Sequence, residues 1–178
     1  MNLRLATIYD LPILKTLYED IVENMKKNNI DIWDNIYPYI AFNDDIKTNS
    51  LYLLINEKYD IVGCFALCES SSGEKHVKWK NPKVKALYLE RLGVNPKFSR
   101  QGIGSILLRH AAKIAKENEV NYLRLFVVDI NKPAINLYVK NGFSKVHGVY
   151  AEKIDGFILR EYGFEIKLDK GVYPNDYK

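Results

Sequence analysis

Hydrophobic and polar positions along the chain switch several times between strand-like and helix-like spacing. Residues 2–8 alternate as a strand, and apolar positions at helical spacing follow from Asp10 to about Lys27. A shorter helix is predicted over 38–47, after a loop. The pattern then predicts strands over 51–56, 61–69 and 84–94, a helix over 103–118, a strand over 122–128, a short helix ending at Asn141-Gly142, and strands over 143–150 and 157–168.

This order of elements indicates a mixed α/β (α+β) fold. The helix over 103–118 joins two strands, and such a crossover makes the strands over 84–94 and 122–128 parallel neighbours. The strands over 51–56 and 61–69 are separated by a short turn that suits an antiparallel hairpin. We expect one domain over residues 1–168, with helices on both faces of the sheet and a C-terminal surface tail over 169–178.

The segment 92–105 carries the clearest chemical signal. It runs from a strand through a glycine-rich turn directly into a helix, whose first turn has unpaired N–H groups. Gly102 and Gly104 leave the backbone open to an anion, and Arg100 adds a cation beside them. Neither a P-loop nor a dinucleotide fingerprint is matched, because no Lys follows the glycines and Leu107 replaces a third glycine. The segment is interpreted as a pyrophosphate cradle, although glycine also serves a plain strand-to-helix turn.

A second motif, N-x-x-A-x-x-x-Y-x-x-x-G-F, follows downstream and is matched at Asn131, Ala134, Tyr138, Gly142 and Phe143. With the glycine loop, it makes the chain resemble the GNAT superfamily of N-acetyltransferases, which use acetyl-CoA. The superfamily's pyrophosphate loop, Q/R-x-x-G-x-G/A, falls on residues 99–104, and the resemblance extends from the first strand to about Leu168. Ser99 stands where the pattern has Gln or Arg, so Arg100 or the backbone has to supply that contact.

The resemblance implies a mostly antiparallel central sheet of about seven strands with a splayed parallel strand pair. In the superfamily, the strand before the glycine loop exposes main-chain groups that hold the pantetheine arm and polarise the thioester. Asn131 is expected to touch the cofactor, against the alternative that it only caps a helix. The predicted acetyl-CoA-binding residues are Leu92, Gly93, Val94, Ser99, Arg100, Gln101, Gly102, Ile103, Gly104, Ser105, Asn131 and Tyr138.

Two residues are candidates for proton transfer. Tyr138 matches a superfamily tyrosine that protonates the CoA sulfur, and a phenol with a pKa near ~10 suits that role; the alternative is a core tyrosine. Glu90 is the candidate base, since it lies four residues before Val94 and therefore on the same face of a regular strand. Its alternative is an ion pair with Arg91 or Arg124, and many superfamily members work without a dedicated base.

The resemblance implies transfer of the acetyl group directly to a primary amine, which we expect to belong to a small molecule. The loop between the first two helices and the later hairpins would line the acceptor cleft, and their aromatic and acidic residues suit a cationic amine. Trp33 has an alternative role as a packing anchor. Two other functions stay open: acetylation of proteins or peptides, and a non-catalytic CoA-binding regulatory module. The predicted acceptor-binding residues are Trp33, Asp34, Tyr37 and Tyr150.

Composition and charge bear on whether the protein binds nucleic acid, a membrane or a metal ion. A net charge of +4 is spread among acidic residues, and the densest lysine run, over 75–85, has no accompanying aromatic platform, so we expect a solvated loop and no nucleic-acid partner. No apolar run reaches the ~20 residues that span a bilayer, and no signal-peptide core is seen, so a cytoplasmic protein without a membrane partner is expected. The three histidines show no metal-ligand spacing, so no metal is expected. A homodimer is left open.

Overall fold

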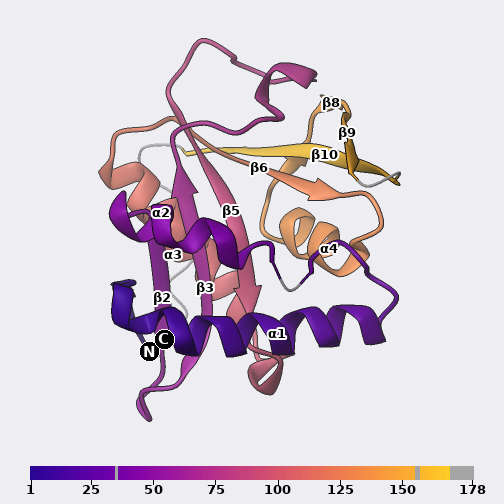
Figure 1. The fold of residues 1–178 in the computed structure, drawn as a ribbon. Helices are drawn as coiled ribbons and strands as arrows, with labels where there is room; N and C mark the ends of the chain where they lie inside the picture. The colour runs from indigo at the N-terminus through magenta and orange to yellow at the C-terminus, as the bar shows by residue number, and fades with distance from the viewer. Residues whose placement is uncertain (35, 155–156, 169–178) are drawn as a thin grey trace.

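The computed structural model describes residues 1–34, 36–154 and 157–168, which form a mixed sheet covered by helices on both faces (Figure 1). The sheet has eight strands in the described residues: β1 (Asn2–Leu5), β2 (Leu51–Ile55), β3 (Ile61–Cys68), β5 (Ala86–Val94), β6 (Tyr122–Val128), β10 (Phe157–Lys167) and β7 (Ser144–Lys145) in that order, with β9 (Tyr150–Ile154) also paired to β10. All neighbours are antiparallel except β5 and β6. The predicted fold class, with its parallel pair, is confirmed.

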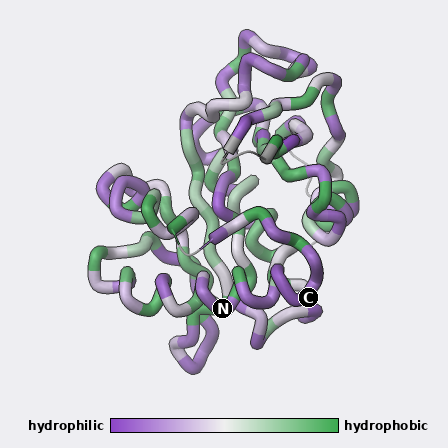
Figure 2. Tube along the Cα trace, turned by 45° about the vertical axis from the view of Figure 1, so that its right-hand side comes forward, coloured by the Kyte–Doolittle hydropathy of each residue, from purple (hydrophilic) through white to green (hydrophobic). Residues whose placement is uncertain are grey.

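The helices form two layers because their apolar stripes face opposite sides of the sheet. α1 (Leu11–Lys27) buries Leu14, Tyr18 and Ile21 at helical spacing, and with α2 (Phe42–Lys47) it covers one face. α3 (Ile103–Glu117) and α4 (Lys132–Lys140) cover the other face. Figure 2 shows hydrophobic residues concentrated along the central strands between these layers. Every residue of β3 except its last, Cys68, is buried, as expected for a strand covered on both faces.

The predicted strand over 143–150 is broken into three short pieces. β7 pairs with β10, whereas β8 (His147–Gly148) leaves the main sheet and pairs with β4 (Val77–Lys78) in a second, two-stranded sheet. Gly148 allows this turn because its φ is +112° and a Cβ there would lie 2.8 Å from the His76 carbonyl oxygen. The first strand is also shorter than predicted, because a 3-10 turn over Ile8–Asp10 follows it.

The middle of β5 contains a β-bulge that changes which side chains share a face. Glu90 lies opposite Ala66 and Gly93 lies opposite Cys64, so two residues of β5 face the single residue between them on β3. One of the two, Arg91, has a φ of +53°. Strict alternation predicted Glu90 and Val94 on one face, and this is wrong.

The register with β3 shows that Glu90 and Val94 point to opposite faces of the sheet. Ala66 belongs to the core under α1, whereas Val94 lies opposite Gly63, and a Cβ on that glycine would meet Leu107 of α3.

Two further predictions concern the ends and the surface of the chain. The predicted tail, 169–178, lies outside the described residues. Within the described part, none of the helices combines the length and the apolar character that a membrane-crossing helix needs.

Candidate active site in the gap between β5 and β6

The parallel strands β5 and β6 separate and leave a gap in the sheet. Their pairing ends at Leu89 and Leu125, although β5 continues to Val94 and β6 to Val128. Figure 1 shows the two arrows diverging, β5 downwards and β6 to the right, with α4 below β6. The Asn95 N–H donates to the Val62 carbonyl of β3, so the alternation of an antiparallel pair turns the peptide groups of Val94 towards the gap. Such groups need a partner, and a ligand in the gap would supply one.

An anion cradle lies beyond the end of β5, where α3 begins. Gly102 is the N-terminal cap of α3, has a φ of +77°, and provides no side-chain hydrogen bond to the helix. A Cβ on Gly102 would meet no atom within 4 Å. The first-turn N–H groups, which belong to Ile103, Gly104 and Ser105, therefore point towards open space, where the helix dipole favours negative charge. The backbone of this segment fits a phosphate group.

The other loop residues take different roles. Arg100 and Gln101 are exposed, with Arg100 at a φ of +59°. The Ser99 hydroxyl donates to the Pro96 carbonyl, so it does not replace the Gln or Arg of the motif directly. The Ser105 hydroxyl accepts a hydrogen bond of 3.0 Å from the Asn141 side chain of α4's C-terminal cap.

Gly104 allows close packing between α3 and α4. A Cβ on Gly104 would lie 2.8 Å from the Leu137 side chain of α4. The two glycines of the motif thus differ: Gly102 faces open space, and Gly104 lets two helices approach each other.

Two residues of the downstream motif lie on α4. Asn131 caps this helix, since its side-chain oxygen accepts from the Ala134 N–H at 3.2 Å, which is the alternative role considered for it. The Tyr138 ring is buried against Phe143 and Phe164, and burial raises the pKa of its hydroxyl.

Within the described residues the Tyr138 hydroxyl has no hydrogen-bond partner, yet no fully buried side-chain oxygen or nitrogen there lacks one. The Tyr138 ring therefore belongs to the core, which is the alternative role considered for it.

Arg91 is the centre of a charged cluster on the α1 face of the gap. Its guanidinium donates to both carboxylate oxygens of Asp45 on α2, at 2.7 and 2.8 Å, and to Glu90 at 2.6 Å. A fourth contact, 3.1 Å long, joins it to the sulfur of Cys68. Burial disfavours the Arg91 charge, but Asp45, Cys68 and Glu90 together raise its pKa. The cluster carries more carboxylates than cations. The ion pair between Glu90 and Arg91 was the alternative to a role for Glu90 as base, and it is present.

Glu161 is a carboxylate at the gap that sequence reasoning missed. It lies opposite Val128, the last residue of β6, and opposite Tyr150, the first residue of β9. Burial, the charge of Glu90 and the charge of Glu152 raise the pKa of Glu161 to about 7. The sequence contains only a weak signal, a carboxylate within the predicted strand 157–168; its meaning depends on the register with β6.

Aromatic residues from the loop between α1 and α2 border the same carboxylates. The Trp33 ring packs 5.6 Å from Tyr18 and 6.4 Å from Tyr37, measured between ring centroids. Burial raises the pKa of the Tyr37 hydroxyl, Arg91 lowers it, and Glu90 and Glu161 raise it, so these groups sense one another's charge. The structure thus places Tyr37 near these carboxylates and packs Trp33 between Tyr18 and Tyr37, as the alternative role of an anchor requires.

The other two predicted acceptor residues differ from each other. Tyr150 is the β9 partner of Glu161, and its ring packs 4.9 Å from His76. The exposed Asp34 carboxylate instead accepts the N–H groups of Ile36 and Tyr37, each at 2.7 Å, and so holds its own loop.

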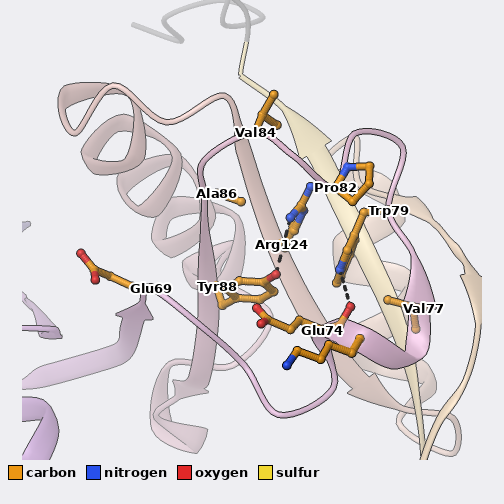
Figure 3. A pocket seen from close by; sticks show the side chains of 10 residues that line it. Glu69, Glu74, Val77, Trp79, Pro82, Val84, Ala86, Tyr88 and Arg124 are labelled. Carbon is orange, nitrogen blue, oxygen red and sulfur yellow. Dashed lines mark hydrogen bonds between the residues drawn. The ribbon is translucent and has the colours of Figure 1, made fainter.

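A separate pocket of about 470 Å³ lies beside the paired first halves of β5 and β6 (Figure 3). Arg124 lines it, but Glu165, the Asn81 carbonyl and the Trp79 ring already surround that guanidinium. In the described part of the chain, no group of three or more His, Cys, Asp or Glu side chains is placed to hold a metal ion. The charged cluster around Arg91 and the open N-terminus of α3 both lie at the gap, so we take the gap as the candidate site.

Comparisons with known proteins agree on one family. The sequence model of the acetyltransferase (GNAT) family matches residues 14–143. Thialysine N-epsilon-acetyltransferase from Bos taurus is 31% identical over 97 residues, which cover 53% of this chain and only 57% of that relative. N-alpha-acetyltransferase from Sulfurisphaera tokodaii is 30% identical over 146 residues, covering 79% of this chain and 86% of the relative. A GNAT-family acetyltransferase structure from Streptococcus agalactiae superimposes with a TM-score of 0.79 at 17% identity, covering 95% of this chain and 96% of that one.

Proposed function

Because this chain belongs to the GNAT family of acetyltransferases, we propose that it transfers the acetyl group of acetyl-CoA directly to the primary amine of a small molecule. The observation that carries the proposal is the gap between β5 and β6, which has an anion cradle at one side and a carboxylate cluster at the other. A donor with phosphates and an acceptor with an ammonium would meet there from opposite faces of the sheet.

The donor side would be held mainly by backbone. The first-turn N–H groups of α3, from Ile103 to Ser105, with Gly102 and Arg100 beside them, would hold the pyrophosphate, and the peptide groups of Val94 would hold the pantetheine arm. Asn131 would contact the cofactor through the side-chain nitrogen that its capping role leaves free. Acetyl-CoA supplies the activated thioester when bound.

Tyr138 is the proposed acid. Its hydroxyl would give a proton to the departing sulfur, and its raised pKa keeps that proton available at neutral pH. No covalent intermediate on the protein is required, because an uncharged amine attacks a thioester carbonyl directly. A group on the acceptor side would remove the proton from the acceptor ammonium.

The acceptor side favours a cation. Asp45, Glu90 and Glu161 outnumber Arg91, and the rings of Trp33 and Tyr37 add surfaces that attract cations. The bovine relative is named for thialysine, an amine of low mass, which supports a small-molecule acceptor. The archaeal relative is named an N-alpha-acetyltransferase and matches more of the chain, so a peptide amino terminus is the second candidate.

A panel assay tests the proposal. The protein is incubated with acetyl-CoA and, separately, thialysine, lysine, simple diamines and short peptides with free amino termini, and free thiol and acetylated product are both measured. A kcat/KM at least tenfold higher for a small amine than for any peptide supports the proposal, and the reverse order supports the peptide candidate. CoA binding without turnover of any amine would indicate the non-catalytic module instead.

A further inference from the structure

Two carboxylates border the gap on the acceptor face, and they occupy different environments. Successive side chains of β10 point to opposite faces of the sheet. Phe164 packs in the core under α3, whereas Glu165 pairs with Arg124 on the other face. Glu161 shares the facing of Glu165 and therefore lies on the same side of the sheet as Glu90. Glu90 thus lies on β5, at one edge of the gap, and Glu161 lies one strand beyond the other edge, next to the last residue of β6.

Glu90 is already engaged in an ion pair. Its carboxylate is 2.6 Å from the Arg91 guanidinium, and Arg91 is itself fixed by two hydrogen bonds to Asp45. The Glu90 carboxylate is therefore held in a fixed, charge-assisted contact with a buried guanidinium, and it is not free to turn to an incoming ammonium.

Glu161 has the opposite surroundings. Among the described residues it has no ion pair and no side-chain hydrogen bond, and the neighbouring cation Arg160 is turned to Asp129 at 3.4 Å. The titratable groups that act on it are Glu90 from β5, Glu152 from β9 and Tyr37 from the loop after α1.

We propose that Glu161, rather than Glu90, takes the proton from the acceptor ammonium, an inference that rests on the proposed function. The raised pKa of Glu161, about 7, agrees with this geometry, because a base near the working pH is charged often enough to act and basic enough to be useful. Glu90 then has a different role: its charge, fixed by Arg91, helps to make Glu161 more basic and to attract the ammonium.

The proton balance is complete. The ammonium N–H bond breaks and its proton moves to the Glu161 carboxylate, which leaves a neutral amine. The amine nitrogen forms a bond to the acetyl carbon, the carbon–sulfur bond breaks, and the sulfur receives the Tyr138 proton. The second proton lost by nitrogen restores Tyr138, and Glu161 releases its proton to solvent.

The decisive experiment compares Glu161→Gln with Glu90→Gln, with the exposed Glu152→Gln as a third variant, over pH 5.5–10. The test amine is thialysine or, if it is not turned over, the best acceptor in the panel. In the wild type, kcat/KM should rise through about pH 7. Glu161→Gln should lower it about a hundredfold at pH 7.5, and the deficit should shrink towards pH 10, where the amine loses its proton unaided. Glu90→Gln should keep the pH-dependent rise but move it to lower pH.

A second measurement does not depend on activity. Carboxyl carbon NMR of the ligand-free protein should give Glu161 a pKa near 7 that falls in Glu90→Gln and changes less in Glu152→Gln. Titration of Glu161 at an ordinary glutamate pKa, or loss of the pH-dependent rise in Glu90→Gln but not in Glu161→Gln, would overturn the inference. A wild type that acetylates no amine would remove the proposed function, whereas unchanged turnover in a folded Glu161→Gln would remove only this inference.

Discussion

The two sides of the gap differ in the groups that form them: peptide groups on one side and charged side chains on the other. The proposed donor side consists mostly of peptide groups within one continuous stretch, from Val94 on β5 through Gly102 to the first turn of α3. The acceptor side consists of side chains from distant segments: Asp45 from α2, Arg91 from β5 and Glu161 from β10. The first depends on local backbone conformation, and the second depends on the whole sheet being assembled.

This difference predicts how each side tolerates change. A backbone cradle is disturbed by what blocks the peptide groups or strains their conformation, so its variants should lose ligand affinity. A buried charge cluster is disturbed by what leaves one charge without its partner, so its variants should lose stability. Measuring ligand affinity and the free energy of unfolding for the same variants separates these two kinds of loss.

The largest expected effect belongs to the acceptor side. Asp45→Ala would leave Arg91 buried with only Glu90 as an ionic partner, since Arg91 and Asp45 expose only 7% and 9% of their side chains. We expect a loss of about 3–5 kcal/mol in the free energy of unfolding, measured by urea denaturation.

The adjacent Asp44 provides a matched control. It makes an exposed contact with Lys47 at 3.1 Å, so Asp44→Ala should cost less than about 1 kcal/mol. Equal losses for the two variants would mean that the cluster around Arg91 adds nothing to stability, and the contrast between the two sides would fail.

Tyr138 belongs to the proposed donor side but would act through its side chain, so it tests whether affinity and chemistry can be separated there. Tyr138→Phe keeps the ring packing and removes the hydroxyl, which should lower kcat by about tenfold to a thousandfold while KM for acetyl-CoA stays within about threefold. Tyr52→Phe, on the distant strand β2, controls for the loss of a hydroxyl from a partly buried tyrosine. Unchanged kcat with a lower melting temperature would assign the Tyr138 hydroxyl to structure alone.

The same contrast explains what could be predicted from the sequence. The glycine turn before α3 and the start of α4 were predicted because their residues are contiguous, and spacing alone determines how Gly102 and Asn131 sit relative to a helix start. Glu161 was missed because its role depends on pairing across β6, which no local pattern contains. The facing of Glu90 was wrong because one extra residue at the Arg91 bulge inverts the alternation.

Substitution of either motif glycine should have a smaller effect. We expect one variant to lose CoA affinity and the other to lose stability. Gly102→Ala would place a methyl group in the open space of the cradle, at a φ of +77°, and should weaken CoA binding about tenfold, or about 1.4 kcal/mol, by calorimetry. Gly104→Ala would press against Leu137 and should lower stability by about 1–3 kcal/mol while the folded protein keeps its affinity. The reverse assignment of the two losses would show that Gly104, and not Gly102, borders the phosphates.

The smallest expected effect concerns Arg100, the exposed cation beside the cradle. Because the Ser99 hydroxyl is turned to Pro96, we expect the exposed Arg100 to assist the backbone with the phosphates. Arg100→Ala should raise the Kd for CoA by about three- to tenfold and leave pantetheine, which has no phosphates, unchanged. The difference should shrink in 1 M salt, where the screening length falls to about 3 Å.

Arg109→Ala, which removes an exposed arginine from the middle of α3, controls for the change in net charge. If Arg109→Ala weakens CoA binding as much as Arg100→Ala does, the attraction comes from the overall charge of the protein. If Arg100→Ala weakens CoA and pantetheine equally, Arg100 does not contact the phosphates and the backbone alone forms the cradle. Either result would strengthen the contrast between a donor side made of peptide groups and an acceptor side made of charged side chains, since Arg100 is the one cation assigned to the donor side.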